Sequence, residues 1–436
     1  MRIQCTPMWI SGGRFLRVGL IALLLLLSAQ AQEPDELLRT AAAALQKEDY
    51  PAAAKTLESY LALKPEDTRA EFNLALAYSF LQRKQEAIER YRNVLSREKE
   101  LPQARLNLGL LLLETGQPAE AVELLQAIVQ QQPANHNALY RLAQALALAN
   151  RNNDAQTAYE QFLSLQPSHV QAHMEVAKLM SASDPAAAAA QYRRVLELDP
   201  AIAEARLLLA EILEAQSGQQ PDGLQEASDL YRQYLDERPE RTDVRITLAK
   251  LYARQKKYLE AIEQYEQAKA AGETGIDLAK DLLHAYLQVP EAKVKAQSLA
   301  EELLAQDGSD AELWLAAGRL RMEKQEYREA AQRFLRATQL KPDWPQGYTN
   351  LASALFLLKN YEGAITALAR ISEWQQDTAG TYFLRAISLD NLRQRKPALE
   401  NYQRFLASDE GKNPDQEFQA RQRVRIISLE LQKGIK

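Results

Sequence analysis

The residues best suited to metal chemistry are His169 and His173, which lie four positions apart with Glu175 close behind. Two neutral imidazoles at this spacing on a helix could share one metal ion. However, His169 lies in a predicted turn before the helix is established, and the sequence offers no evident third ligand. We therefore interpret the two histidines as solvated surface residues and predict no metal site.

The sequence also lacks the motifs of common catalytic sites. It contains no G-x-S-x-G elbow, no G-x-x-x-x-G-K-[ST] phosphate loop and no H-E-x-x-H zinc pair. Phosphate-binding loops are usually rich in glycine, and the chain has only 16 glycines in 436 residues. Carboxylate pairs such as Glu301 and Glu302 are more simply solvated helix faces. We predict no catalytic residue, no cofactor and no enzymatic activity, with an improvised site on a groove as the remote alternative.

The first 31 residues have the layout of a secretory signal peptide. They combine three arginines, an apolar run from Val18 to Leu27 and a small-x-small site at Ala29-Gln30-Ala31. The run is shorter than the roughly 20 residues that span a bilayer, but an uncleaved anchor stays an alternative. We expect export to a bacterial periplasm, with an extracellular or signal-anchored protein as alternatives and no membrane contact after cleavage.

Composition narrows the function classes further. The only cysteine, Cys5, precedes the cleavage site, so the mature chain would have no disulfide and no thiolate chemistry. Loss of the three arginines would change the net charge from −5 to −8, and no basic block follows, so nucleic-acid binding has no electrostatic support. The chain is rich in Ala, Leu, Gln and Glu, which favour helices. This composition predicts an all-α protein.

The chain repeats one pattern with a period of about 34 residues. In Ala70–Lys99, two apolar stripes with three- and four-residue spacing flank a polar break, which predicts a hairpin of two helices. Most copies end in a proline, which stops the second helix because it lacks an N–H group. These prolines are Pro65, Pro133, Pro167, Pro200, Pro239 and Pro342.

Small residues recur at fixed positions in both helices of the hairpin. The alanine column of the second helix holds Ala53, Ala87, Ala121, Ala155, Ala188, Ala227, Ala261, Ala296, Ala330, Ala364 and Ala398. The small column of the first helix holds Ala41, Ala75, Gly109, Ala143, Ala177, Ala210, Ala249, Gly318, Ala352 and Ala386. Because small side chains let helices approach closely, we expect leucine at Ala261 to destabilise the array, and leucine at Lys257, taken as exposed, to be nearly neutral.

This pattern resembles the tetratricopeptide repeat. The clearest copy, Trp314 to Pro342, matches the family signature at Trp314, Gly318, Tyr327, Ala330, Phe334, Ala337 and Pro342. Arg321 stands where the family usually has an aromatic residue, a departure expected to affect local packing only. The resemblance covers nearly the whole mature chain and implies a right-handed superhelical α-solenoid of about eleven helical hairpins.

The repeats also predict how the chain is divided. We expect a signal peptide at 1–31, repeats one to six at 34–241, repeats seven to eleven at 242–410 and a C-terminal capping helix at 413–436. The sixth repeat has extra residues at Ser217–Gly223 and the eighth has a blurred first helix, so both are candidates for softer joints. In the capping helix we expect Phe418, Val424, Ile427 and Leu431 on one apolar face.

The resemblance implies a concave groove, lined by the first helices, which in this family commonly holds an extended peptide or a partner helix. Residues just off the packing stripe should face it, and amides among apolar side chains suit an extended segment. The predicted groove residues are Phe72, Asn73, Leu76, Leu106, Asn107, Leu110, Tyr140, Arg141, Gln144 and Asn350.

A structural interpretation of the same residues stays open. Asparagine in this column can serve the fold, and Phe72 or Tyr140 can pack against the next repeat. One specialisation is disfavoured, since repeats that clamp a C-terminal carboxylate place a lysine where this chain has Phe72, Leu106 and Tyr140.

The sequence thus predicts a non-catalytic scaffold or assembly factor of the cell envelope that binds other proteins in its groove. The alternative is a structural subunit of an envelope or secretion complex that uses its convex or terminal surfaces.

Overall fold

The computed structural model describes residues 34–216 and 223–434. All regular elements in these two ranges are helical: 23 α-helices and one short 3-10 helix, η1, with no strand among them. The predicted all-α fold is confirmed. The signal peptide expected at residues 1–31 and most of the long turn expected at 217–223 lie outside the described ranges. None of the helices described is both long and apolar enough to span a bilayer.

The chain forms two compact units, residues 1–215 and 216–436. The helices of the N-terminal unit are α2 (Pro34–Gln46), α3 (Tyr50–Leu63), α4 (Thr68–Phe80), α5 (Lys84–Arg97), α6 (Pro102–Glu114), α7 (Pro118–Gln131), α8 (His136–Leu148), α9 (Asn152–Leu165), α10 (Val170–Met180), α11 (Pro185–Leu198) and α12 (Ala203–Gln216). Those of the C-terminal unit are α13 (Gly223–Glu237), α14 (Thr242–Arg254), α15 (Tyr258–Ala270), α16 (Ile276–Gln288), η1 (Pro290–Ala292), α17 (Lys293–Gln306), α18 (Ala311–Glu323), α19 (Tyr327–Leu340), α20 (Pro345–Leu357), α21 (Tyr361–Ile371), α22 (Ala379–Asn391), α23 (Arg395–Ser408) and α24 (Pro414–Gln432).

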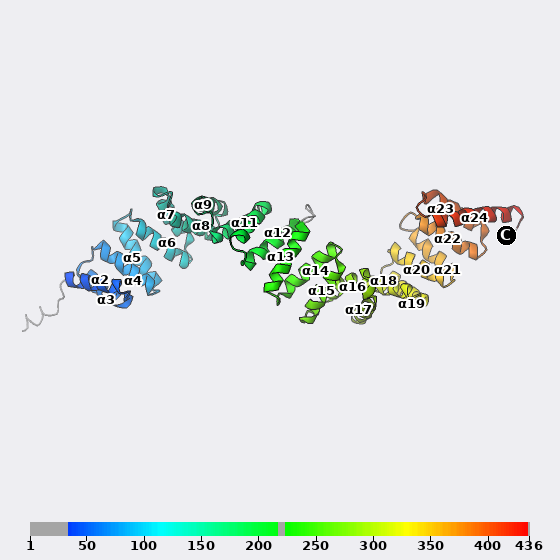
Figure 1. Cartoon of the computed structure of the whole chain (residues 1–436), viewed down its shortest axis with the longest axis horizontal. Helices are drawn as coiled ribbons and strands as arrows, with labels where there is room; N and C mark the ends of the chain where they lie inside the picture. Colours follow the sequence, from blue (N-terminus) through cyan, green and yellow to red (C-terminus); the bar gives the residue numbers. More distant parts are fainter. Residues whose placement is uncertain (1–33, 217–222, 435–436) are drawn as a thin grey trace, which may run out of the picture. The chain divides into compact units, whose positions relative to one another are not determined.

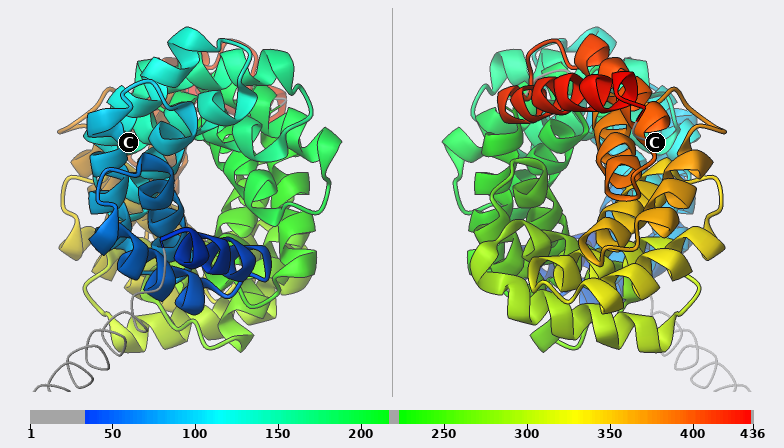
Figure 2. Two further views of the ribbon diagram at one scale, coloured as in Figure 1. Left: turned by 90° about the vertical axis from the view of Figure 1, so that its left-hand side faces the viewer. Right: turned by 90° about the vertical axis from the view of Figure 1, so that its right-hand side faces the viewer.

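Within each unit, consecutive helices pair as hairpins, and the first helix of each hairpin packs on the second helix of the one before (Figure 1). Both views of Figure 2 show successive helices side by side in the order of the chain. The division between the units falls in the sixth repeat, between α12 and α13. The domain boundary expected after residue 241 marks the end of a repeat and stays a prediction.

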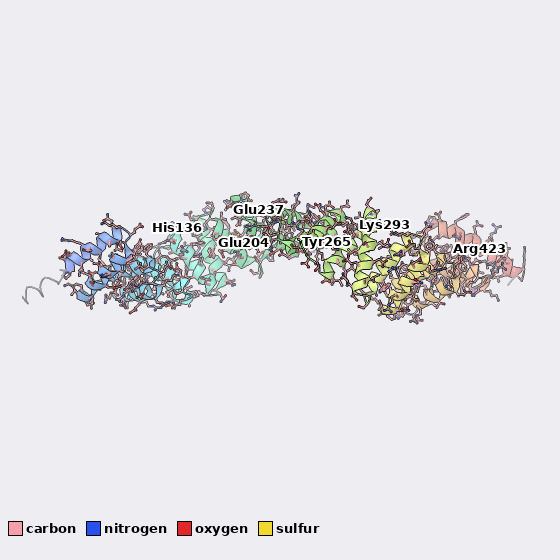
Figure 3. The ribbon with its side chains drawn as sticks, turned by 90° about the horizontal axis from the view of Figure 1, so that it is seen from below. His136, Glu204, Glu237, Tyr265, Lys293 and Arg423 are labelled. Carbon is pink, nitrogen blue, oxygen red and sulfur yellow. The ribbon has the colours of Figure 1, made fainter. Side chains whose placement is uncertain are left out.

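The two columns of small residues form the closest contacts in the hairpins. All eleven residues of the alanine column are completely buried, at 0% exposure. The large residue that follows four positions later is buried beside it, as Tyr91, Phe334 and Tyr402 are. Tyr265, labelled in Figure 3, has the same role in α15. Small side chains therefore bring the paired helices together, and an aromatic ring fills the space next to them.

The turn inside most hairpins contains one residue in the left-handed region. In these turns the positive φ value falls five residues before the alanine column, at a position held by glycine at Gly116 (φ 74°) and by larger residues such as Gln82 (φ 59°) and Lys256 (φ 60°). The next amide then closes the helix, as Arg83 N does by donating to Tyr78 O at 2.9 Å. The sequence analysis did not detect this position. Glycine is the residue that usually marks such a turn, and among these described turns it occurs there only at Gly116.

A second recurrent contact closes the turn between repeats. Four residues after the N-cap of the first helix, a side chain donates a hydrogen bond to the backbone carbonyl six residues earlier. Arg245 Nη2 lies 3.0 Å from Pro239 O, and Trp314 Nε1 lies 2.9 Å from Gly308 O. His173 and Arg206 contact the carbonyls of Pro167 and Pro200 in the same way. In three of these four repeats the proline that ends a helix therefore also supplies the acceptor that orients the next one.

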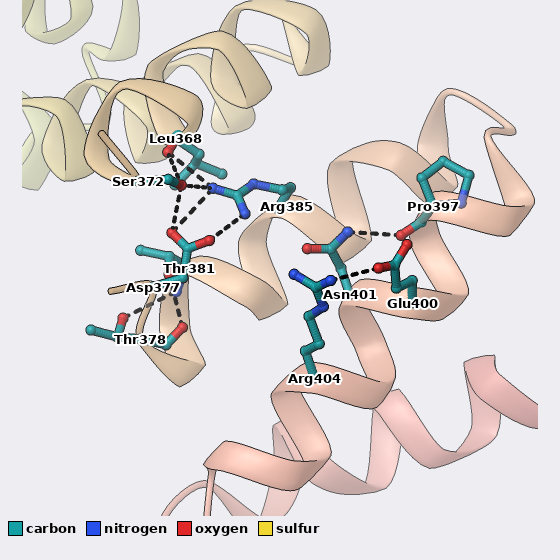
Figure 4. Close-up of polar contacts among 10 residues, drawn as sticks. All are labelled: Leu368, Ser372, Asp377, Thr378, Thr381, Arg385, Pro397, Glu400, Asn401 and Arg404. Carbon is teal, nitrogen blue, oxygen red and sulfur yellow. Dashed lines mark hydrogen bonds and ion pairs between the residues drawn. The ribbon is translucent and has the colours of Figure 1, made fainter. Parts of the chain in front are cut away.

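The turn between α21 and α22 is held differently, by a nearly buried ion pair (Figure 4). Asp377 accepts from Arg385 at 2.6 Å and from Ser372 Oγ at 2.9 Å, and Arg385 also donates to Leu368 O at 3.0 Å. Burial alone would raise the pKa of Asp377, but the hydrogen bonds from Arg385 and Ser372 outweigh it, so that its pKa lies below its ordinary value.

The capping helix α24 packs on α23 through Ala420 and Ile427, with Val424 and Leu431 partly buried beside them. The expected placement of Phe418 on this face was wrong, since Phe418 is 68% exposed. It lies two residues before Ala420, on the opposite side of a helix with about 3.6 residues per turn. Arg423, labelled in Figure 3, fixes α24 by donating to both oxygens of the buried Asp390 at 2.6 and 2.7 Å.

Candidate functional site

The side of the N-terminal unit formed by the first helices α4, α6 and α8 is called the first-helix face below. Two cavities lie on it, at equivalent places in the second and fourth repeats. The one in the second repeat has a volume of about 490 Å³ and is lined by Arg69, Phe72 and Asn73 of α4 and by the start of α6. Phe72 is half-buried, and its ring meets the buried ring of Tyr91 edge-on at 5.5 Å. The floor of this cavity is therefore a fixed aromatic side chain.

The cavity of the fourth repeat has a volume of about 360 Å³ and is built around Tyr140. This ring packs against Phe162 at 5.1 Å and against His169 at 5.0 Å. His136, labelled in Figure 3, and Asn137 complete the wall from the start of α8. Burial raises the pKa of Tyr140, with a smaller contribution from Glu175, so its hydroxyl is a neutral hydrogen-bonding group at physiological pH.

The equivalence of the two cavities follows from the helix register. Phe72 and Tyr140 each lie five residues after the N-cap of their helix, which is Asp67 in α4 and Asn135 in α8. The caps fix the register because their side chains accept hydrogen bonds from the first-turn amides, Ala70 N and Ala138 N. Equivalent cavities thus recur two repeats apart.

The two predicted amides of this face have different surroundings. Asn107 Nδ2 donates to the hydroxyl of the buried Tyr91 at 2.9 Å, so this side chain serves the fold. Asn73 makes no side-chain hydrogen bond to any residue that the structure describes, and it lines the cavity of the second repeat. Asn73 is therefore the amide that is available to a bound chain.

The remaining predicted residues also lie half-buried at the surface. Arg141 donates to Gln144 at 3.0 Å, beside Tyr140 on α8. Asn350, in the C-terminal unit, donates to the carbonyl of Gln346 in its own helix at 3.0 Å. Leu76, Leu106 and Leu110 are also half-buried. The structure thus places nine of the ten predicted residues on α4, α6 and α8, and the role of all ten in binding stays a prediction.

The sequence analysis missed a further cavity of about 410 Å³ in the C-terminal unit. Its lining includes Lys280, His284 and Leu287 of α16 and Arg319 of α18. Lys280 lies five residues after the N-cap Gly275, the position of Phe72 in α4, and its ammonium group pairs with Asp310 at 2.6 Å. The sequence analysis named no groove residue in this repeat, because its first helix was not clear from the sequence.

Another cavity lies on the second-helix side of the hairpins, between α17 and α19. Its volume is about 670 Å³, and it is lined by Trp314, Leu335 and several charged residues. Arg333 reaches over the ring of Trp314 and pairs with Glu301 at 2.7 Å. None of the predicted groove residues lines this cavity.

The two histidines considered for a metal both make structural contacts. His169 Nδ1 accepts from Ala172 N at 3.1 Å and caps α10. His173 is buried, so its assignment as a surface residue was wrong, and both of its ring nitrogens contact oxygens, of Pro167 and Gln191. No group of three or more potential metal-ligating side chains occurs in residues 34–216 or 223–434.

Sequence models of the tetratricopeptide repeat match residues 38–89, 72–136, 112–179, 178–221, 222–276 and 315–378. Together these matches cover more than half of the chain. The chain belongs to the tetratricopeptide repeat family. Proteins with such repeats typically act as non-catalytic interaction scaffolds. Their stacked hairpins form an extended surface that can bind a partner.

Three solved structures illustrate the likeness to other tetratricopeptide repeat chains. MamA from Desulfovibrio magneticus RS-1 is 20% identical with a TM-score of 0.37, over 39% of this chain and 98% of that one. Yeast Tom70 is 13% identical (TM-score 0.35; 92% and 96% of the two chains), and a chain of the APC/C hetero-tetramer Cut9–Hcn1 is 16% identical (TM-score 0.36; 92% and 98%). Likeness at this level carries no argument about partners. No curated protein matches the sequence.

Proposed function

We propose that this tetratricopeptide repeat protein is a non-catalytic scaffold or assembly factor that holds an extended segment of a partner protein on the first-helix face of its N-terminal unit. The observation that carries the proposal is the recurrence of an aromatic-floored cavity at Phe72 and again at Tyr140. Two cavities two repeats apart suit apolar side chains at two separate positions of one extended chain.

Polar groups beside the cavities support an extended segment. Asn73 offers an amide with both donor and acceptor capacity, and Arg141 and Gln144 lie next to Tyr140. An extended chain keeps its backbone N–H and C=O groups free, so it needs such partners when it leaves water. A partner helix satisfies its own backbone and would not need them.

We place this function in the cell envelope, because the first 31 residues have the layout of an export signal. The mature chain would then work without cysteine chemistry, in a compartment where disulfides are common.

Capture of partner proteins from an envelope fraction tests the proposal. Asn73→Ala should reduce the amount of captured partner about tenfold without changing the melting temperature, because the lost amide bonds only the ligand. Gln126→Ala, an exposed position on the second helix α7 of the third repeat, is the matched control and should capture like the wild type. Equal capture by both variants would remove the first-helix face as the binding surface.

A structural subunit of an envelope or secretion complex is the second candidate. It is favoured by the large cavity at Trp314 and Leu335, which lies on the second-helix side. Such a subunit should co-purify in fixed stoichiometry, and Leu335→Glu should release it from the complex while Asn73→Ala should not.

A further inference from the structure

The eighth repeat, formed by α16, η1 and α17, lacks the local contacts that fix most other hairpins. No residue of its turn, all of which is described, has a positive φ, and Val289 is extended (φ −112°, ψ 113°). Ala279, four residues after the N-cap, has no side-chain N–H group that could reach an earlier carbonyl. Leu283, eight residues after the N-cap, stands where the other repeats carry alanine or glycine. The two helices of this hairpin are therefore held less tightly.

Three cavities border the same repeat. The cavity of about 670 Å³ lies between α17 and α19, and the cavity of about 410 Å³ is lined by α16 and α18. A third, of about 230 Å³, is lined by Tyr286 of α16 and Leu299 of α17 together with the end of α15. Surface next to a cavity lacks packed neighbours and the dispersion contacts that they supply. Packing therefore contributes less to the position of this repeat than close contact would.

Ion pairs connect the eighth repeat to both of its neighbours. Glu301 of α17 pairs with Arg321 at 3.0 Å and with Arg333 at 2.7 Å, both in the ninth repeat. Lys293, labelled in Figure 3, pairs with Glu323 of the ninth repeat at 2.6 Å. Further pairs with the neighbouring repeats are Lys250–Asp281, Lys269–Glu302, Lys295–Glu266 and Lys280–Asp310. Most of these side chains are well exposed, so dissolved salt can screen the pairs.

The tenth repeat, formed by α20 and α21, is held in the opposite way. Its turn contains Lys359 with a φ of 60°, and Asn360 N closes α20 by donating to Leu355 O at 2.9 Å. Ala352 of the small column is completely buried. Among the described residues, no ion pair joins this hairpin to another repeat. The same chain thus contains a hairpin whose contacts salt should not weaken.

We propose that the eighth repeat is a joint that opens locally while the adjacent hairpins stay folded, and that ionic strength controls how often it opens. Salt weakens the ion pairs by screening, and this repeat has fewer of the contacts that salt leaves intact. Opening separates Lys280 from Asp310 and so changes the cavity that α16 and α18 share. This inference is independent of the function proposed for the N-terminal unit.

Hydrogen exchange of the full chain, measured by mass spectrometry, tests the proposal. At about 20 mM NaCl, the amides of α16 and α17 should exchange at least about tenfold faster than those of α20 and α21. Raising NaCl to about 500 mM should accelerate exchange in α16 and α17 about fivefold and leave α20 and α21 unchanged within about twofold. Equal exchange in the two hairpins overturns the proposal, as does exchange in α16 and α17 that salt does not change.

A charge-neutralising variant gives a second readout. Glu301→Gln keeps the size of the side chain but removes two ion pairs with the ninth repeat, so it should accelerate exchange in α16 and α17 about threefold at low salt. The effect should shrink at high salt, where the pairs are already screened. Glu329→Gln, at an exposed residue of α19, is the matched control and should leave this exchange unchanged. An acceleration by Glu301→Gln that is equally large at both salt concentrations overturns the proposal, because lost packing and not lost charge would then explain it.

Discussion

His173 lies between two oxygens, with Nε2 3.0 Å from the carbonyl of Pro167 and Nδ1 2.6 Å from Gln191 Oε1. The first contact ties the start of α10 to the turn that follows α9, and the second ties α10 to α11. One buried ring thus connects two repeats of the N-terminal unit. At the same position of other repeats, Arg206, Arg245 and Trp314 also donate to the carbonyl six residues earlier, from a guanidinium or an indole N–H group.

Replacement of this ring tests the contact. His173→Leu should lower the free energy of unfolding by about 2 kcal/mol, because the buried ring loses its hydrogen bonds to the carbonyl of Pro167 and to the side chain of Gln191. Gln171→Leu, at an exposed position of the same helix, should change it by less than about 0.5 kcal/mol. Chemical denaturation measures both. Similar losses for the two variants would contradict a structural role for His173.

Gly318 and Phe334 provide a second test, of the contact between the two columns. Alanine normally stabilises a helix interior by about 1 kcal/mol relative to glycine. Here a Cβ at Gly318 would lie 2.5 Å from Phe334 Cε1, so Gly318→Ala should instead destabilise the C-terminal unit by about 1–2 kcal/mol. Gly380→Ala, at the start of α22, is the control and should not destabilise, because the nearest atom to an added Cβ is Thr378 Oγ1 at 3.9 Å, an ordinary contact distance. Thermal unfolding that ranks the two variants the other way would refute this packing.

The fold was predictable from the sequence because its main determinant is periodic. Alanine at a fixed position is visible without knowledge of the structure, and each of the eleven is completely buried. The turn contacts were not predictable in this way, since histidine, arginine and tryptophan all serve at the same position. Any side chain with an N–H group that reaches the earlier carbonyl is sufficient, so the residue type does not repeat.

The candidate site was predictable only in its outline. Phe72 and Tyr140 have equivalent places on α4 and α8, because both follow the N-cap by five residues, and their role in binding stays a prediction. The sequence pattern could not distinguish Asn73 from Asn107. Only Asn107 donates a hydrogen bond to the hydroxyl of Tyr91, and this contact depends on the three-dimensional structure. Lys257 was wrongly taken as exposed: it is half-buried at the start of α15, where its ammonium group donates to Gln225.

The alanine column predicts a large difference between two neighbouring positions of α15. Ala261→Leu should destabilise the C-terminal unit by about 1–3 kcal/mol, because Ala261 is completely buried in a close helix contact. Glu260→Leu, at the exposed residue just before it, should be nearly neutral and replaces Lys257 as the control. If both variants melt at the same temperature, the register of the hairpin is wrong.

Asp377 predicts a dependence of stability on pH. The folded-state pKa of Asp377 lies below the unfolded value of about 3.9. The carboxylate therefore stabilises the fold fully above about pH 3.9, and this stabilisation is lost as the pH falls through the folded-state pKa. Asp377→Asn should therefore cost about 3 kcal/mol at pH 7, by leaving Arg385 without its ion pair, and progressively less below about pH 4. The control is Asp236→Asn, at an exposed residue of α13. A pH-independent cost for the Asp377 variant would contradict the assignment.

The two asparagines of the first-helix face should separate stability from binding. Asn107→Ala should destabilise the N-terminal unit by about 1 kcal/mol, since the buried hydroxyl of Tyr91 loses its partner. Asn73→Ala should leave the free energy of unfolding unchanged, because this amide bonds none of the described residues. Denaturant titration of both variants measures the difference, and an equal loss would mean that Asn73 also serves the fold.

Photo-cross-linking in intact cells tests the central claim most directly. A photoreactive residue in place of Arg69, which lines the cavity of the second repeat and leaves Asn73 intact, should give one discrete adduct with a partner protein. Tyr140→Ala in the same chain should diminish that adduct. The same probe in place of Gln126, on the second helix α7, should not give it. An adduct of equal strength from both positions, or one that persists without the Tyr140 ring, would contradict binding on the first-helix face.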